Sequence, residues 1–150
     1  MTRSILVAGF LVLAACAPAD EVKENATVAN GEVAPPTPQD VTVRIAAAQA
    51  GGRVEVAVNQ RFAVELVGVP TAGYIWAPAQ MPAFVQRAGE ASGNTSQQQS
   101  QPGFAGGDHW EVTMFVATQA GEGEIVMEQR RPWETTEPPV DVFRVTIVAR

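Results

Sequence analysis

The side chains that most often perform chemistry in proteins are scarce in this sequence. The 150 residues contain one histidine, His109, and one cysteine, Cys16, far apart along the chain. Neither stands at a spacing typical of a nucleophile and its base, or of a cluster of metal ligands. We therefore expect no catalytic set, no metal site and no cofactor, and we predict that the protein is not an enzyme. The remaining possibility is that the protein binds a partner through surface loops of defined shape.

Three short segments rich in Gly, Pro and aromatic residues are candidates for that recognition. They are VPTAGY (69–74), PGFAGGDHW (102–110) and RRPWE (130–134). In the first, Pro70 restricts φ and Gly73 permits a positive φ or a close backbone approach, so the loop is thin. Thr71 and Ala72 between them are slim. We expect the aromatic residues that follow, Tyr74 and Trp76, to brace this narrow loop against the body of the protein.

Apolar residues alternate with other residues over most of the chain after Asp40, which is typical of β-strands. The alternating segments are 41–46, 53–58, 61–67, 109–117, 123–128 and 141–149, with two further strand-like pieces at 74–78 and 84–89. Apolar residues that share a face include Phe62, Val64 and Leu66, then Trp110, Val112, Met114 and Val116, then Phe143, Val145 and Ile147. The pattern predicts an all-β, Ig-like antiparallel β-sandwich of about seven to eight strands. The alternative is a partly open barrel.

The order of these strands places the three segments relative to one another. Two strand-like pieces separate the first segment from the second, and two more separate the second from the third. In an antiparallel path, loops separated by two strands emerge at the same end of the sandwich. The sequence therefore predicts one continuous surface, and loops on a rigid scaffold commonly carry binding.

The N-terminal segment predicts export and anchoring. Arg3 precedes an apolar run from Ile5 to Val12, which is too short to span a bilayer and reads as a signal peptide over residues 1–15. Cys16 follows the small residues of LAAC and resembles the acylated cysteine of a bacterial lipoprotein; an ordinary secretory signal is the alternative. We predict a lipidated disordered tether over 16–40, a β-sandwich domain over 41–150, and an outer-membrane anchor facing the periplasm.

Charge excludes two classes of partner. The chain has 16 acidic residues against 10 Lys and Arg, one of which is Arg3, so the mature protein carries a net charge of about −7. An acidic chain without a basic stripe does not suit nucleic acid or anionic lipid. We expect a monomer, with the polar tract Ala91 to Gly103 forming a long exposed loop in which Gln97, Gln98 and Gln99 are only solvated.

The ordered motifs VPTAGYIW, a glycine-rich turn before an alternating strand, RRPWE and a terminal FRVTIV resemble the chagasin-like inhibitors of papain-type cysteine peptidases. That family has an Ig-like fold and three binding loops with the motifs N-P-T-T-G-Y/F, G-x-G-G and R-P-W. The resemblance covers residues from about 41 to 150. The inhibitory residues that it implies are Pro70, Thr71, Ala72, Gly73 and Tyr74 in the first loop, Gly103, Phe104, Gly106 and Gly107 in the second, and Arg131, Pro132 and Trp133 in the third.

The sequence departs from the motif at three positions. Val69 replaces the asparagine, Ala72 replaces the second threonine, and Phe104 stands where the first glycine is expected unless Gly103 takes that part. These departures bear on inhibitory strength and on the choice of target. The resemblance implies reversible occlusion of a papain-like active-site groove; the alternative is an Ig-like envelope module that binds through the same loops without inhibition.

Each aromatic residue also has a structural interpretation. Trp76 and Trp110 fit the core better than a binding surface because their strands alternate, whereas Tyr74 fits either. Trp133 follows a proline in an expected loop and fits a contact residue. Arg131 either contacts the partner or pairs with Glu134 or Glu128 at the base of the loop.

Overall fold

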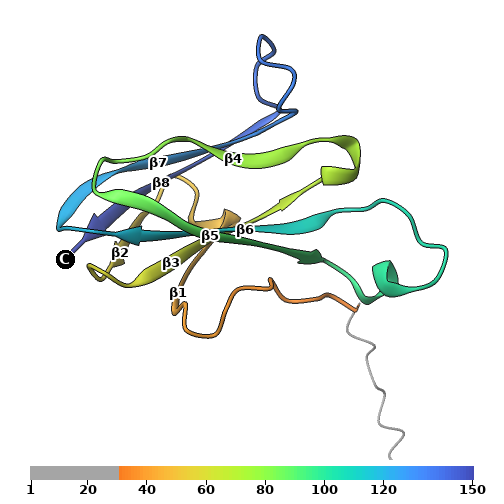
Figure 1. Cartoon of the computed structure of the whole chain (residues 1–150), viewed down its shortest axis with the longest axis horizontal. Helices are drawn as coiled ribbons and strands as arrows, with labels where there is room; N and C mark the ends of the chain where they lie inside the picture. Colours follow the sequence, from red (N-terminus) through yellow and green to blue (C-terminus); the bar gives the residue numbers. More distant parts are fainter. Residues whose placement is uncertain (1–30) are drawn as a thin grey trace, which may run out of the picture.

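Two four-stranded sheets pack face to face in a sandwich. A computed structural model describes residues 31–150 of the chain, and the strands are β1 (Val43–Ala46), β2 (Arg53–Val56), β3 (Arg61–Gly68), β4 (Ile75–Gln80), β5 (Val85–Asn94), β6 (His109–Ala117), β7 (Gly121–Arg130) and β8 (Asp141–Ala149). The strand order is β1-β3-β6-β5 in the first sheet and β2-β8-β7-β4 in the second (Figure 1). The predicted all-β sandwich is confirmed, and the predicted signal peptide and the lipidation site expected at Cys16 lie outside the described residues.

Most neighbouring strands are antiparallel, but each sheet carries one parallel edge strand. β1 pairs with β3 and β2 pairs with β8 in parallel register. Parallel neighbours need a crossover connection. For β1 and β3 the connection passes through β2, which lies between them in the chain and belongs to the opposite sheet. The other edge strands, β4 and β5, lie on the same side of the sandwich, where residues of both line one cleft.

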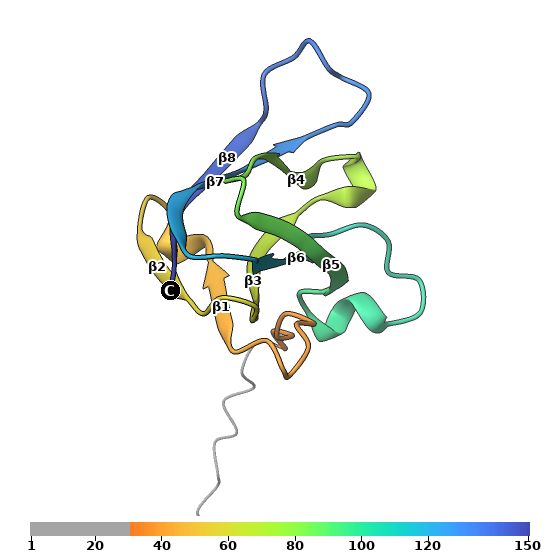
Figure 2. The ribbon, with the colours of Figure 1, turned by 60° about the vertical axis from the view of Figure 1, so that its left-hand side comes forward.

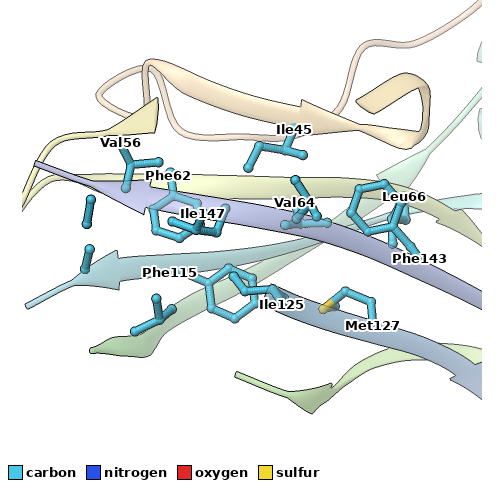
Figure 3. Close-up of a cluster of buried hydrophobic side chains, with 14 of the residues drawn as sticks. Ile45, Val56, Phe62, Val64, Leu66, Phe115, Ile125, Met127, Phe143 and Ile147 are labelled. Atoms are coloured by element: carbon cyan, nitrogen blue, oxygen red, sulfur yellow. The ribbon is translucent and has the colours of Figure 1, made fainter. Parts of the chain in front are cut away.

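The core between the sheets is built from the strand faces that the alternation predicts for β3 and β8. Phe62 stacks on Phe115 with ring centroids 5.6 Å apart, and both are fully buried (Figure 3). The two predicted faces in this core are Phe62, Val64 and Leu66 in β3 and Phe143, Val145 and Ile147 in β8. Alternation therefore located the buried side of these strands.

In β6 apolar side chains occur on both faces, and the predicted face points outward. Phe115 and Ala117 enter the core between the sheets, whereas Val112 and Met114 form a separate buried cluster with Val41. Trp110 is half-buried outside the main core, so its prediction as a core residue is wrong. An apolar outer face needs a cover of its own, because exposed apolar area costs free energy.

Part of that cover is the segment Gly31 to Asp40, which we call the strap; it contacts Gly93 and Trp110 and leads into the buried Val41. The sequence predicted these ten residues as the end of a disordered tether, but they lie along the first sheet (Figure 1). Thr37 is buried and its hydroxyl donates a hydrogen bond to the Glu65 carboxylate, and Asp40 pairs with Arg61. Composition alone suggested a solvated chain because the apolar surface beneath the strap is supplied by residues distant in sequence.

The polar tract 91–103 is more regular than predicted. β5 continues through Asn94 and a short 3-10 helix spans Gln97–Ser100, so only the rest of the tract is loop. β5 extends because it pairs with β6 along its whole length, to Asn94 opposite His109. Ladder hydrogen bonds outweigh the weak strand preference of these polar residues.

Candidate functional site: three loops at one end

The three predicted segments emerge at the same end of the sandwich. Gly68 at the end of β3 and Asn94 at the end of β5 both lie opposite His109 at the start of β6, and Ile75 at the start of β4 lies opposite Arg130 at the end of β7. The first loop is 69–74, the second 95–108 and the third 131–140. Figure 2 shows them in a row with the first loop in the middle. The predicted common end is confirmed.

Backbone hydrogen bonds close the first loop. Pro70–Ala72 form one 3-10 turn, and the Val69 carbonyl accepts from the N–H groups of Ala72 at 2.9 Å and Tyr74 at 3.2 Å. Gly73 ends the turn with φ of +85°, a left-handed conformation that favours glycine. Since a main-chain carbonyl closes this turn, the absence of an asparagine side chain at Val69 leaves it intact.

Trp76 anchors the first loop to the sandwich. Its ring is buried in the core and its indole N–H donates to the Val67 carbonyl at 2.9 Å. Its backbone N–H donates to Glu111 Oε2 at 2.7 Å. Both strands that flank the loop, β3 and β4, are thereby tied together, so the loop is held from behind as the sequence suggested.

Arg131 joins the third loop to the first. Its Nε donates to the Ala72 carbonyl at 3.0 Å, and its guanidinium lies 4.5 Å above the centre of the Tyr74 ring. The Glu134 carboxylate accepts from it at 3.0 Å, and this hydrogen bond raises the pKa of Arg131. The pairing left open by the sequence is thus with Glu134, because Glu128 pairs with Arg130 at 2.5 Å.

Trp133 leaves most of its surface in solvent while resting on the first loop. It is 68% exposed, the largest exposed fraction among the large apolar side chains of residues 31–150. One edge of its indole lies over Gly73, where an added Cβ would stand 2.9 Å from Cζ2 and closer still to Cη2. Pro132 precedes it and fixes the local φ. The first and third loops therefore form one continuous surface with an exposed aromatic ring.

The second loop is glycine-rich and is tied at its ends by Gln99. Gly103, Gly106 and Gly107 have φ values of +83°, +85° and +93°, and Phe104 among them is 45% exposed. The Gln99 amide oxygen accepts from Thr95 N–H at 2.7 Å, and its amide nitrogen donates to the Asp108 carbonyl at 2.6 Å. The prediction that the glutamines are only solvated is wrong for Gln99, which links the start of the loop to its end.

A cleft of about 370 Å³ opens between the β4 and β5 edges beside the base of the first loop, with Pro70, His109 and Glu111 in its lining. His109 Nδ1 lies 3.1 Å from the Gly107 carbonyl. Within residues 31–150, Glu111 Oε1 is buried without a hydrogen-bond partner. Burial raises the pKa of Glu111 above its ordinary value of 4.5, against the opposing effect of the Trp76 N–H. Sequence analysis missed Glu111 because an acid in an alternating strand reads as solvent-facing.

Replacing Glu111 with glutamine is expected to raise the free energy of unfolding at pH 7. A raised folded-state pKa means that the folded protein holds this proton more tightly than the unfolded chain. The stability that the protonated group contributes is complete below about pH 4.5 and is lost as the pH rises through the folded value. Glutamine carries no charge and still accepts from Trp76 N–H.

Urea unfolding of both proteins from pH 4 to pH 8 measures this effect. The advantage of Glu111→Gln is expected to shrink toward zero at the acidic end, where the native carboxyl is also neutral. A variant that is less stable than the native protein at pH 7 would contradict the assignment of Glu111 as a costly buried charge.

Two features were looked for in the part of the chain that the structure describes, a metal-binding cluster and a membrane-spanning helix. Between residues 31 and 150 there is no group of three or more His, Cys, Asp or Glu side chains placed to hold a metal ion. Over the same range, no helix has the length and apolar character needed to cross a membrane.

Comparisons with known proteins agree with this arrangement. The chain is similar to the crystal structure of a cysteine protease inhibitor, EhICP2, from Entamoeba histolytica, with 15% identity over 76% of this chain and 100% of that chain, at a TM-score of 0.59. It is also similar to the solution structure of Amebosin, with 23% identity over 72% of this chain and 97% of that chain, at a TM-score of 0.55. No curated protein sequence matches it. At such identities these similarities establish the shared fold.

Family membership rests on the sequence match. The family described as Chagasin family peptidase inhibitor I42 matches residues 55–147. This range begins in β2, ends in β8 and includes all three loops. Because it covers more than half of the 150 residues, the chain belongs to the chagasin family of peptidase inhibitors.

Proposed function

We propose that this protein is a reversible inhibitor of papain-like cysteine peptidases, and that its three loops occlude the active-site groove. The observation that carries the proposal is the joined surface of the first and third loops, in which Trp133 rests on Gly73 and Arg131 reaches the Ala72 carbonyl. A groove between two lobes accepts a narrow, supported projection, and the first loop has that shape. Membership of a family of peptidase inhibitors supports inhibition as the function of this surface.

The first loop suits insertion without cleavage. Its tip is a closed 3-10 turn with two backbone hydrogen bonds to the Val69 carbonyl. A loop already fixed in its bound shape loses little conformational entropy on docking. A turn closed in this way also keeps its peptide bonds out of the extended alignment that a catalytic thiol attacks, so the loop resists hydrolysis.

The flanking loops add contact area on both sides. Trp133 offers an exposed aromatic face from the third loop, and Phe104 offers a second from the middle of the second loop. Aromatic residues that are buried only in the complex commonly dominate binding energy. We assign the role of central wedge to residues 70–74, and the role of lateral contacts to Gly103, Phe104, Gly106, Gly107 and the Arg131–Trp133 segment.

We also propose that the protein acts from the cell envelope as a monomer, anchored to the outer membrane through lipid on Cys16 and facing the periplasm. The support is the N-terminal sequence, in which a short apolar run ends at LAAC. The second candidate function, an envelope binding module without inhibitory activity, is favoured by the motif departures at Val69 and Ala72. The inhibitor is the better-supported candidate because the first loop is closed despite both departures.

Titration of the mature chain into papain tests the function. Residues 16–150 with Cys16→Ser are mixed with papain and a fluorogenic peptide substrate. We expect reversible inhibition with a constant at or below about 1 µM, the range in which a specific protein interface binds. If the chain inhibits none of several papain-like enzymes, the binding module is favoured. Substrate turnover by the chain alone would indicate an enzyme.

A further inference from the structure

The strap reaches one end of the second loop through main-chain hydrogen bonds. The Gln97 N–H donates to the Gly31 carbonyl at 2.6 Å, and the Val33 N–H donates to the Thr95 carbonyl at 2.8 Å. These bonds flank an antiparallel bridge between Glu32 and Ser96. The strap therefore adds a short strand to the segment with which the second loop begins.

The strap also reaches the other end of the second loop. The indole N–H of Trp110, two residues after Asp108, donates to the Val33 carbonyl at 2.6 Å. Val33 thus bonds through its N–H to the residue that enters the loop and through its carbonyl to the strand that leaves it. One residue outside the loop holds both of its ends.

Close packing fixes the strap on this surface. Pro36 lies over Gly93 of β5, where an added Cβ would stand 3.3 Å from Pro36 Cγ, so the glycine leaves room for the strap. Further along, Val41 is fully buried with Val112 and Met114, and Thr37 bonds to Glu65. These contacts set where Val33 lies, because they anchor the chain that follows it.

The second loop needs such an external support. Three of its glycines have left-handed φ values, and open space surrounds Gly103 and Gly106. Glycine-rich backbone has high conformational freedom, which must be lost when a loop docks. Gln99 ties the loop internally, and the strap bonds to Thr95 and Gln97 at its start and to Trp110 just after its end.

We propose that the strap, residues 31–40, is a positioning element of the inhibitory surface that presets the second loop for docking. It lies before residue 55, where the family match begins. The inference rests on the proposed function for its effect on inhibition. It extends the functional unit beyond the three loops, and it makes the strength of inhibition depend on a segment outside them.

Two proline variants of the mature chain, residues 16–150 with Cys16→Ser, test the proposal. Val33→Pro removes the N–H that bonds to Thr95, whereas Ala34→Pro is the matched control because the Ala34 N–H makes no hydrogen bond to another residue between 31 and 150. We expect Val33→Pro to speed hydrogen exchange of the Gln97 amide by at least about tenfold, as local opening of a strand pair does. We expect it to weaken inhibition of papain at least about threefold.

A second pair covers the case in which Val33→Pro does not fold. Trp110→Phe removes the indole N–H that bonds to Val33 but keeps an aromatic ring, and Thr118→Val removes a hydroxyl bond to the Phe84 carbonyl at the opposite end of β6. Both lose one side-chain bond to a main-chain carbonyl. Only Trp110→Phe is expected to speed Gln97 exchange and weaken inhibition. We expect this even when its loss in the free energy of unfolding is equal to or smaller than that of Thr118→Val.

The outcomes separate this proposal from the proposed function. If Val33→Pro matches Ala34→Pro, or Trp110→Phe matches Thr118→Val, in both Gln97 exchange and inhibition, the strap does not position the loop. If exchange changes but inhibition does not, positioning for docking is overturned. If the unaltered chain inhibits no papain-like enzyme, the proposed function fails, and exchange at Gln97 alone then decides whether the strap holds the loop.

Discussion

Replacing Trp133 with alanine is expected to weaken inhibition of papain at least about tenfold, because truncation of an aromatic anchor typically costs about 2 to 4 kcal/mol of binding free energy. The side chain is 68% exposed, and one edge of its ring lies over Gly73. Little stability is therefore lost with the ring. The free energy of unfolding is expected to stay within about 0.5 kcal/mol of the native value.

Val140→Ala is the control for this variant. Val140 lies in the same loop and is 59% exposed, but it has no aromatic ring and is not among the side chains nearest to the Gly73 position. We expect less than about a threefold change in its inhibition constant, as for most residues at the rim of an interface. If Trp133→Ala unfolds the protein, Trp133 belongs to the core. If it inhibits as well as the native protein, Trp133 is not an anchor.

Gly73→Val is expected to have a larger effect, on the order of a hundredfold or more in the inhibition constant, because two separate faults combine. Gly73 has φ of +85°, and a β-branched residue held there costs on the order of 1 to 3 kcal/mol. The new Cβ would also stand 2.9 Å from Cζ2 of Trp133 and would displace the ring. The wedge and its neighbouring anchor would both move.

Gly51→Val separates backbone strain from loss of the site. Gly51 also has a left-handed φ, of +72°, but nothing lies within 4 Å of its added Cβ, and it belongs to none of the three loops. Unfolding experiments are expected to show that both valine variants lose stability, whereas inhibition assays show a large loss only for Gly73→Val. Equal inhibition by Gly73→Val and the native protein would show that the first loop does not enter the groove.

Alternation of apolar residues predicted most of this fold because two-sheet packing demands it. The predicted segments 109–117 and 141–149 coincide with β6 and β8. The same rule failed for the outer face of β6, where Val112 and Met114 alternate as regularly as Phe115 and Ala117 but pack with Val41 and Ala63 instead of the other sheet. Period two identifies a strand with two faces, and it does not say which face meets the other sheet when both carry apolar side chains.

The loops of the candidate site were predictable from motif and strand order, whereas the contacts within the site were not. Trp133 lies over Gly73 because β4 and β7 pair with Ile75 opposite Arg130, a register that the sequence does not display. Gln99 and Glu111 gain their roles from hydrogen bonds with Asp108 and Trp76, and the sequence does not show either of these pairings. Such roles depend on which distant residues the fold brings together. The composition of a short segment predicts only whether that segment suits solvent.

The dependence of inhibition on substrate concentration tests groove occlusion most directly. The apparent inhibition constant of the mature chain toward papain is measured at several concentrations of a fluorogenic peptide. If the loops fill the groove, the constant rises linearly with substrate concentration, and the maximal rate is recovered at saturating substrate. A constant that does not change with substrate concentration would place the protein elsewhere on the peptidase and would contradict occlusion of its groove.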